Sequence, residues 1–214
     1  LGGLTMAALV PDGPHLAAPA KFSARALVVI VRDRAVRASA FGYFGHMGEL
    51  YAFFVLLPLI VALRWQGEAA AWWVFAGIAI GTLSCVAGGV FARRYGSARI
   101  AAAQLACSGA CALVSPWLLD APLGVWALWI LLWGATVSGD SPQFSALTAA
   151  NAPRTQVGSV LTLVNCIGFS ISVATIAAFV ALAALWPLGQ VLPWLALGPA
   201  LGLLCMKPLL IPAK

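Results

Sequence analysis

Charged residues are scarce in this sequence. Only 8% of its 214 residues are Asp, Glu, Lys or Arg, whereas a typical soluble domain has about 25%. Of all residues, 63% are hydrophobic and the mean hydropathy is +0.99, so no polar stretch is long enough to form a separate soluble domain. No water-soluble fold buries that much apolar surface. The composition therefore excludes a soluble protein and indicates a single membrane domain.

The sequence also lacks the motifs of several function classes. It has no His-Glu-x-x-His zinc pattern, no Gly-x-Ser-x-Gly nucleophile turn and no nucleotide-binding glycine loop with Lys. The five cysteines lie inside apolar runs, and an odd number so placed gives no disulfide framework. Cys107 and Cys111 are one helical turn apart, but no further Cys or His flanks them. We expect no enzyme activity, no bound metal and no cofactor.

Six apolar segments are long enough to cross a membrane, which takes roughly 20 residues for about 30 Å of hydrocarbon. Their connections are short, so neighbouring helices run antiparallel. The fold class we predict is an all-α integral membrane protein, a bundle of six transmembrane helices over residues 38–214. The predicted spans are 38–63, 70–92, 99–119, 122–149, 157–185 and 189–212.

The net charge of +6 suggests nucleic acid in a soluble protein, but here the basic residues mark membrane topology. Eleven of the twelve Lys and Arg residues lie at the two ends or in the second and fourth connections, and only Arg64 lies on the other side. The positive-inside rule then places both termini in the cytoplasm. We expect a multi-pass protein of the plasma membrane, the inner membrane of a bacterium, with no nucleic-acid partner.

Residues 1–37 precede the predicted bundle. Within them, an apolar stretch between basic residues, from Phe22 to Arg37, suits a helix lying at the membrane surface. A solvated linker is the alternative for this stretch.

Three Asp, Glu or His residues lie deep inside the predicted spans, and a charge near the bilayer centre costs at least about 2.5–3.5 kcal/mol. They are His46, Glu49 and Asp140. Tyr43, His46 and Glu49 are spaced by three and so share one helix face. At about 1.5 Å per residue, His46 and Glu49 lie roughly 12 Å and 16 Å from the cytoplasmic start of their span. We expect this stripe to face a cavity or a neighbouring helix.

The run from Gly139 to Gln143 interrupts the fourth span. Asp or Ser is a favoured N-cap and Pro suits the first helical position, so Asp140, Ser141 and Pro142 indicate a helix restart. Two half-helices with a binding site between them are one interpretation. A proline kink with Asp140 as its local cap is the other.

Candidate site residues follow from these positions: Tyr43, His46, Glu49, Asp140, Gln143 and Asn165. Asn165 lies at a similar depth in the fifth span, although a single Asn often only bonds one helix to another. Because burial favours the neutral form of a carboxyl group, a buried Glu49 can bind and release a proton. Our hypothesis is that Glu49 carries a coupling proton. The alternative is a structural pair, His46 and Glu49, bonded to neighbouring helices.

Residues Gly89 to Gly96 resemble the Gly-x-Leu-Ala-Asp-Arg-x-Gly loop of the major facilitator superfamily. Gly89, Arg94 and Gly96 match it, as does Ala92, whereas Arg93 stands where the family usually has Asp. The run 157–168 is similar to the start of helix eleven of that family, and the run 41–54 to helix seven of its bacterial members. These similarities occur in the order that the family requires.

The resemblance implies the carboxy-terminal half of such a transporter, helices seven to twelve. It also implies that residues 1–10 end helix six and that residues 11–37 form the central cytoplasmic linker. The partner is then an amino-terminal six-helix half or a second copy, within the lipid bilayer. The expected function is secondary active transport of a small solute by symport or antiport. Alternatives are a non-transporting membrane scaffold or decayed transporter fragment, and an intramembrane enzyme.

Overall fold

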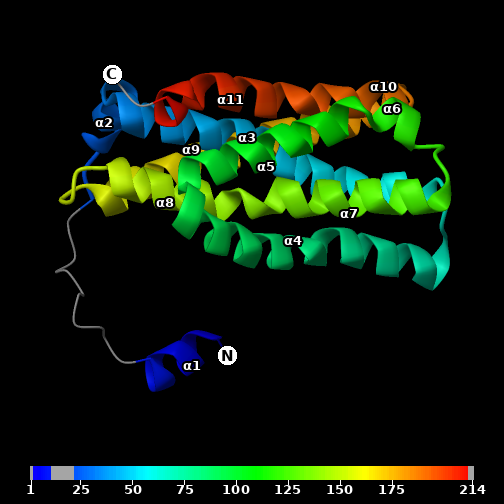
Figure 1. The fold of residues 1–214 in the computed structure, drawn as a ribbon, viewed down its shortest axis with the longest axis horizontal. Helices are drawn as coiled ribbons and strands as arrows, with labels where there is room; N and C mark the ends of the chain where they lie inside the picture. Colours follow the sequence, from blue (N-terminus) through cyan, green and yellow to red (C-terminus); the bar gives the residue numbers. More distant parts are fainter. Residues whose placement is uncertain (1, 11–21, 212–214) are drawn as a thin grey trace.

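The structure, a computed structural model, describes residues 2–10 and 22–211, and its regular elements are all helices. Two short helices come first, α1 (Gly2–Leu9) and α2 (Ala26–Arg32). α1 lies apart from the main bundle (Figure 1). α2 falls within the stretch for which a surface helix was one alternative, and it packs against the bundle with Ala26 and Ile30 buried. Residues 11–21 of the predicted linker lie outside the described residues.

The remaining helices run along the long axis of one bundle (Figure 1). Among the described residues, five segments are long and apolar enough to cross a membrane. The predicted span 99–119 coincides with two shorter helices, of 17 and four residues, separated by Val114. The bundle helices are α3 (Arg34–Ala62), α4 (Gly67–Tyr95), α5 (Ser97–Leu113), α6 (Ser115–Leu118), α7 (Leu123–Gly139), α8 (Ser141–Asn151), α9 (Val157–Leu185), α10 (Leu188–Val191), the 3-10 helix η1 (Leu192–Ala196) and α11 (Leu197–Leu210).

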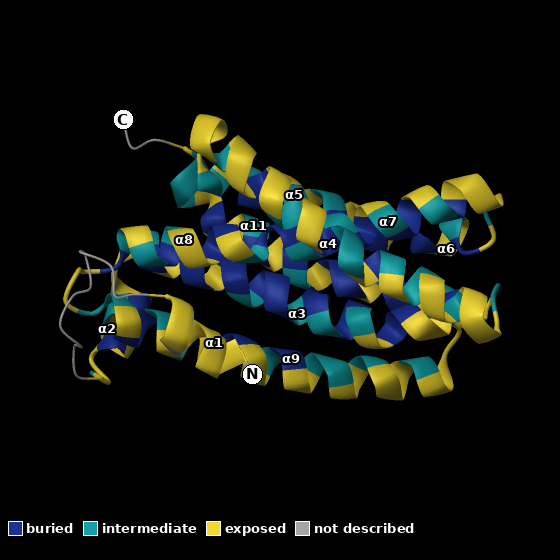
Figure 2. Ribbon diagram, turned by 90° about the horizontal axis from the view of Figure 1, so that it is seen from below, coloured by how far each residue is buried: buried dark blue, intermediate teal, exposed yellow. Residues whose placement is uncertain are grey.

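α3 is the central helix of the bundle. Asp33 caps its start, since its carboxylate accepts hydrogen bonds of 2.9 Å from the backbone N–H groups of Ala35 and Val36. Of its most apolar 18 residues, 67% are buried, compared with 17% for α4 and 11% for α9. Figure 2 shows the contrast between the buried α3 and the exposed outer face of α9. A polar group on α3 is therefore more enclosed than one on α4 or α9.

Glycines allow α11 to pack closely against α3. A Cβ atom on Gly45 would lie 2.7 Å from the Cα of Gly202 and would collide with the backbone oxygen of Gly198. Small residues at such crossings let helix backbones approach in a membrane, where packing replaces the hydrophobic effect between helices. This contact fixes the register of α3, and with it the depth of His46 and Glu49.

The helix of the fourth predicted span is kinked at Asp140, the single residue between α7 and α8, which keeps a helical conformation (φ −80°, ψ −20°). Pro142 has no N–H with which to bond the backbone oxygen of Ser138, and the thiol of Cys85 approaches that oxygen at 3.5 Å. The backbone oxygen of Asp140 accepts hydrogen bonds from the N–H groups of Gln143 and Phe144, so α8 continues directly from the break. Asp140 was the local cap in one of our two interpretations of this run, but its side chain accepts no capping hydrogen bond.

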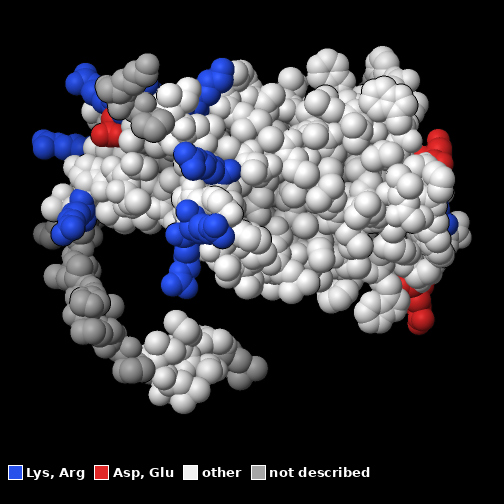
Figure 3. Space-filling view, in the orientation of Figure 1, with Lys and Arg blue, Asp and Glu red and all other residues white. Residues whose placement is uncertain are grey.

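Most Lys and Arg side chains gather at one end of the bundle (Figure 3). They belong to α2, the start of α3, the α4–α5 turn and the end of α11. Arg64 lies at the opposite end, where its Nε donates a 2.9 Å hydrogen bond to the backbone oxygen of Leu119. The asymmetry seen in the sequence is thus an asymmetry along the long axis of the fold.

Candidate functional site

The polar stripe on α3 is buried along its whole length. Tyr43, His46 and Glu49 are 5%, 1% and 0% exposed. Glu49 is close to the midpoint of the helix by residue number, about 22 Å from Arg34 at about 1.5 Å per residue. Three successive turns of the most enclosed helix therefore each present a polar side chain to the interior.

His46 meets Asp140 across the interface between α3 and the α7–α8 break. The Nδ1 atom of His46 lies 2.9 Å from Oδ1 of Asp140, and both side chains are completely buried. The two atoms are at ion-pair distance but not in hydrogen-bond alignment. No other ion pair occurs within residues 2–10 and 22–211. The break in the helix thus places a carboxylate beside a buried imidazole.

The outer atoms of this pair have no protein partner. Within the described part of the chain, neither Nε2 of His46 nor Oδ2 of Asp140 makes a hydrogen bond. Leaving a buried polar atom unpaired costs about 1–3 kcal/mol, and more when the group is charged. A donor or acceptor from a solute, from water or from another chain lowers that cost. The pair can therefore form further hydrogen bonds with a bound molecule.

Aromatic rings enclose the His46 imidazole. The rings of Tyr43 and Phe144 lie 5.8 Å and 5.9 Å from it, centroid to centroid, and 6.4 Å from each other. Gln143 is buried beside Phe144 in the first turn of α8. The structure thus gathers four of the six predicted site residues, Tyr43, His46, Asp140 and Gln143, around one break in the bundle.

Glu49 has a separate set of partners on α5 and α7. Its Oε2 accepts a 2.8 Å hydrogen bond from the Ser108 hydroxyl, and its Oε1 accepts one of 2.7 Å from the Trp133 indole N–H. Both donors are neutral, and no Lys, Arg or His of the described chain forms an ion pair with Glu49. The carboxyl group is held in place without a counter-charge, so a proton is the simplest means of neutralising it.

No group of three His, Cys, Asp or Glu side chains that could hold a metal ion occurs in the described part of the chain. The cysteines there are all free thiols, and Cys111 is buried in the core.

Sequence reasoning missed Ser108 and Trp133. Trp126, Trp129 and Trp133 are all buried on α7. The signal was present, because Trp133 precedes Asp140 by seven residues, two helical turns, and so lies on the same face of the span. Ser108 carried no comparable signal, since serine is common inside membrane helices.

Asn165 lies elsewhere. Its side chain is exposed on α9, and it makes no hydrogen bond to another residue that the structure describes. The structure therefore does not bring Asn165 to the cluster around His46 and Glu49.

The loop motif forms the tight turn between α4 and α5. Gly96 is its only linking residue and has a φ of 84°, a conformation that residues with a side chain rarely adopt. Arg93 and Arg94 end α4 and are exposed, with the guanidinium of Arg94 5.4 Å from the Tyr95 ring centre. Gly89 faces open space. The motif thus provides a basic turn at the end of the bundle where basic residues gather.

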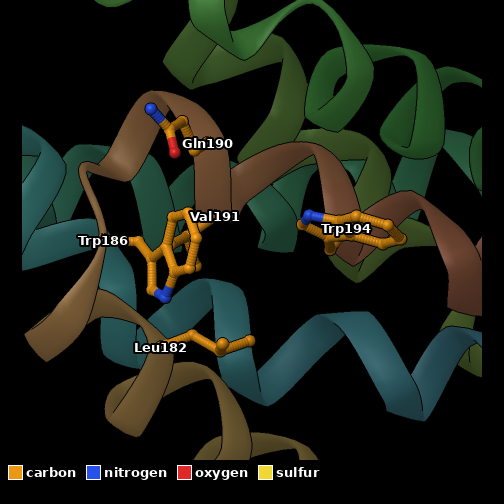
Figure 4. Close-up of a pocket in the computed structure, with 5 residues that line it drawn as sticks. All are labelled: Leu182, Trp186, Gln190, Val191 and Trp194. Atoms are coloured by element: carbon orange, nitrogen blue, oxygen red, sulfur yellow. The ribbon is translucent and has the colours of Figure 1, made fainter.

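An apolar pocket lies where α9 turns into α10. Figure 4 shows its five lining residues, of which only Gln190 is polar: Leu182, Trp186, Gln190, Val191 and Trp194. None of them is ionisable. This pocket has none of the acid–base groups that distinguish the centre of the bundle.

The model of the Major Facilitator Superfamily matches residues 1–177 of the chain. The chain belongs to the Major Facilitator Superfamily. A comparison with curated proteins gives no match. The family match covers the whole polar cluster of this superfamily member, from α3 to α9, and also the loop motif. Membership in this superfamily, together with the apolar helices, identifies a multi-pass membrane protein of a transporter family.

The hydrogen bond from Trp133 to Glu49 predicts a stability difference between two tryptophan substitutions. Trp133→Phe removes the indole donor and leaves Oε1 of Glu49 unpaired, which costs about 1–3 kcal/mol beyond the lost ring volume. Trp126→Phe is the control, because Trp126 is equally buried and its indole N–H has no partner in the described chain. The Arg64 guanidinium lies 5.6 Å from the centre of the Trp126 ring, and weakening that contact works against the expected difference.

Thermal unfolding of the purified protein in detergent measures the difference. We expect Trp133→Phe to lower the melting temperature more than Trp126→Phe does. Equal losses would show that the bond to Glu49 contributes nothing to stability.

Proposed function

We propose that the chain crosses the membrane six times and forms the carboxy-terminal half of a secondary transporter. Five of the crossings are the long apolar segments given above, and α5 and α6 together form the remaining one, the third in chain order. Val114, which joins them, keeps a helical conformation (φ −83°, ψ −1°), and its N–H still bonds the backbone oxygen of Ala110. From Ser97 to Leu118 the combined helix is about 33 Å long at about 1.5 Å per residue, enough for a hydrocarbon core of about 30 Å.

In this proposal the basic end of the bundle faces the cytoplasm and both termini lie there, in the plasma membrane of a bacterium. The missing wall of the pathway comes from an amino-terminal six-helix half or from a second copy. The exposed Asn165 supports such pairing, because an amide that faces lipid has no hydrogen-bond partner whereas a neighbouring half can offer one.

The transported molecule is a small solute, moved by alternating access past the centre of the bundle. The observation that carries this proposal is the buried contact between His46 and Asp140, whose outer atoms have no hydrogen-bond partner among the described residues. It lies at the kink between α7 and α8, where Pro142 removes one backbone hydrogen bond from the membrane interior. A solute that hydrogen-bonds Nε2 and Oδ2 satisfies both groups.

Glu49 has the role of coupling residue in this proposal. Its carboxyl group is fully buried and has only neutral donors around it, so it is held in an apolar interior without a cation. Binding a proton removes the charge, and releasing it restores the charge. A cycle that alternates these states links proton movement to solute movement. Glu49 lies one helical turn from His46 on α3, so the two events share one helix.

Glu49→Gln keeps the size of the side chain and one of its two hydrogen-bond acceptors but cannot release a proton. In the active assembly that contains this chain, we expect uptake to lose its pH dependence while substrate exchange continues. Glu68→Gln is the matched control, since Glu68 is exposed in the first turn of α4. Uptake by reconstituted vesicles over a pH series measures the effect. Unchanged proton coupling in Glu49→Gln would rule this role out.

The proposed orientation is tested by labelling cysteines that replace loop residues, after the native cysteines are changed to serine or alanine. A membrane-impermeant maleimide should label Gln66→Cys in intact cells, because the α3–α4 loop faces outward. It should label Thr155→Cys, in the α8–α9 loop, only after the cells are made permeable. The reverse pattern would contradict the assignment of the basic end to the cytoplasm.

A further inference from the structure

An open groove runs along the outside of the bundle between α9 and α11. Both helices pack against α3 but are separated from each other, and the groove between them has a volume of about 430 Å³. Aromatic rings from α3, α9 and η1 form part of its walls, among them Phe41, Phe179 and Trp194. This volume is within the range of about 300–1,000 Å³ for sites that bind small organic molecules.

Glycines form part of the floor of the groove. Gly45, Gly48 and Gly198 all line it, and the first and last of these also bring α3 and α11 together. Gly48 differs from its neighbours, because a Cβ atom there would lie at an ordinary distance of 3.7 Å from the Cα of Gly198. A side chain added at Gly48 therefore enters the groove without forcing the helices apart.

A basic pocket of about 340 Å³ adjoins the groove at the end of the bundle where Lys and Arg gather. Phe41 and Cys205 line both spaces, so the apolar groove and the basic pocket are neighbours. The cations of the pocket are Arg34, Arg37 and Lys207, and no acidic residue lines it.

These cations have no anionic partner within the described chain. None of the three forms an ion pair there. Arg37 donates one 2.7 Å hydrogen bond, to the backbone oxygen of Val31, and its guanidinium keeps further N–H groups free. The nearby carboxylate of Asp33 is engaged in capping α3. The pocket is therefore a concentration of positive charge at the height of the membrane surface.

The length of the groove matches one leaflet of a bilayer. Trp194 and Cys205 line its two ends on η1 and α11 and are eleven residues apart. At about 1.5 Å per residue this is about 16 Å, and half of a hydrocarbon core of about 30 Å is about 15 Å. An acyl chain that starts at the basic pocket can therefore follow the groove over about the length of one leaflet.

We propose that this groove and pocket bind one anionic phospholipid. Its phosphate is held by Arg34, Arg37 and Lys207, since guanidinium groups bind phosphate through paired N–H donors. One acyl chain lies over Gly48 between α9 and α11. Basic pockets between membrane helices on the cytoplasmic side suit such headgroups. The site is separate from the polar cluster and does not depend on transport.

The test measures lipid binding to the purified assembly that contains this chain, by native mass spectrometry. Phosphatidylglycerol and phosphatidylcholine with identical acyl chains are added separately. The headgroup variant combines Arg34→Gln, Arg37→Gln and Lys207→Gln. Its matched control combines Arg93→Gln, Arg94→Gln and Arg99→Gln, which removes the same charge at the same end of the bundle.

We expect the wild type to retain phosphatidylglycerol in preference to phosphatidylcholine. The headgroup variant should lose about a hundredfold in affinity for phosphatidylglycerol, and the control variant much less. Equal retention of the two lipids, or equal losses in the two variants, would overturn the proposal.

The tail site is tested independently. Gly48→Leu fills the groove but leaves the basic pocket unchanged, and Gly89→Leu is its control, since Gly89 on α4 faces open space. We expect Gly48→Leu to release phosphatidylglycerol and Gly89→Leu to retain it. Retention by both variants would show that no acyl chain lies in the groove.

Discussion

A charged side chain inside a membrane must be paired, neutralised or hydrated, because hydrocarbon forms no hydrogen bond or ion pair with it. This constraint shapes the bundle. His46 and Glu49 both lie on α3, and α3 is the helix most enclosed by the others. Glycines at Gly45, Gly198 and Gly202 let α11 approach closely enough to complete that enclosure. The helix break then brings Asp140 to His46, while Ser108 and Trp133 supply the hydrogen bonds to Glu49.

Much of this arrangement follows from local features of the sequence. Hydropathy locates long apolar helices, because an apolar run of about 20 residues is long enough to cross a bilayer as a helix. The spacing of Tyr43, His46 and Glu49 by three predicts one polar face of one helix, and all three are buried together. Asp140, Ser141 and Pro142 indicate an interruption of the helix, and in the structure α7 ends at Gly139 and α8 begins at Ser141.

Other features depend on tertiary packing and could not be predicted in this way. Tryptophan suits both a membrane interface and a core, and only the packing of α7 shows that Trp133 reaches Glu49. Asp is a residue type favoured at helix N-caps, yet the carboxylate of Asp140 lies next to His46 instead of capping α8. Asn165 lies at the expected depth, but the rotation of α9 turns it outward. Depth follows from counting residues, whereas helix rotation depends on neighbours far away in the sequence.

The central claim is that Glu49 gains and loses a proton inside the membrane. Infrared difference spectroscopy of the purified assembly, recorded as the pH is changed, measures it directly through the carbonyl stretch of a protonated carboxyl group. We predict a pH-dependent band of this kind that is absent in Glu49→Gln and present in Glu68→Gln. A spectrum in which Glu49→Gln removes no such band would contradict the account, because Glu49 would then carry no proton to couple.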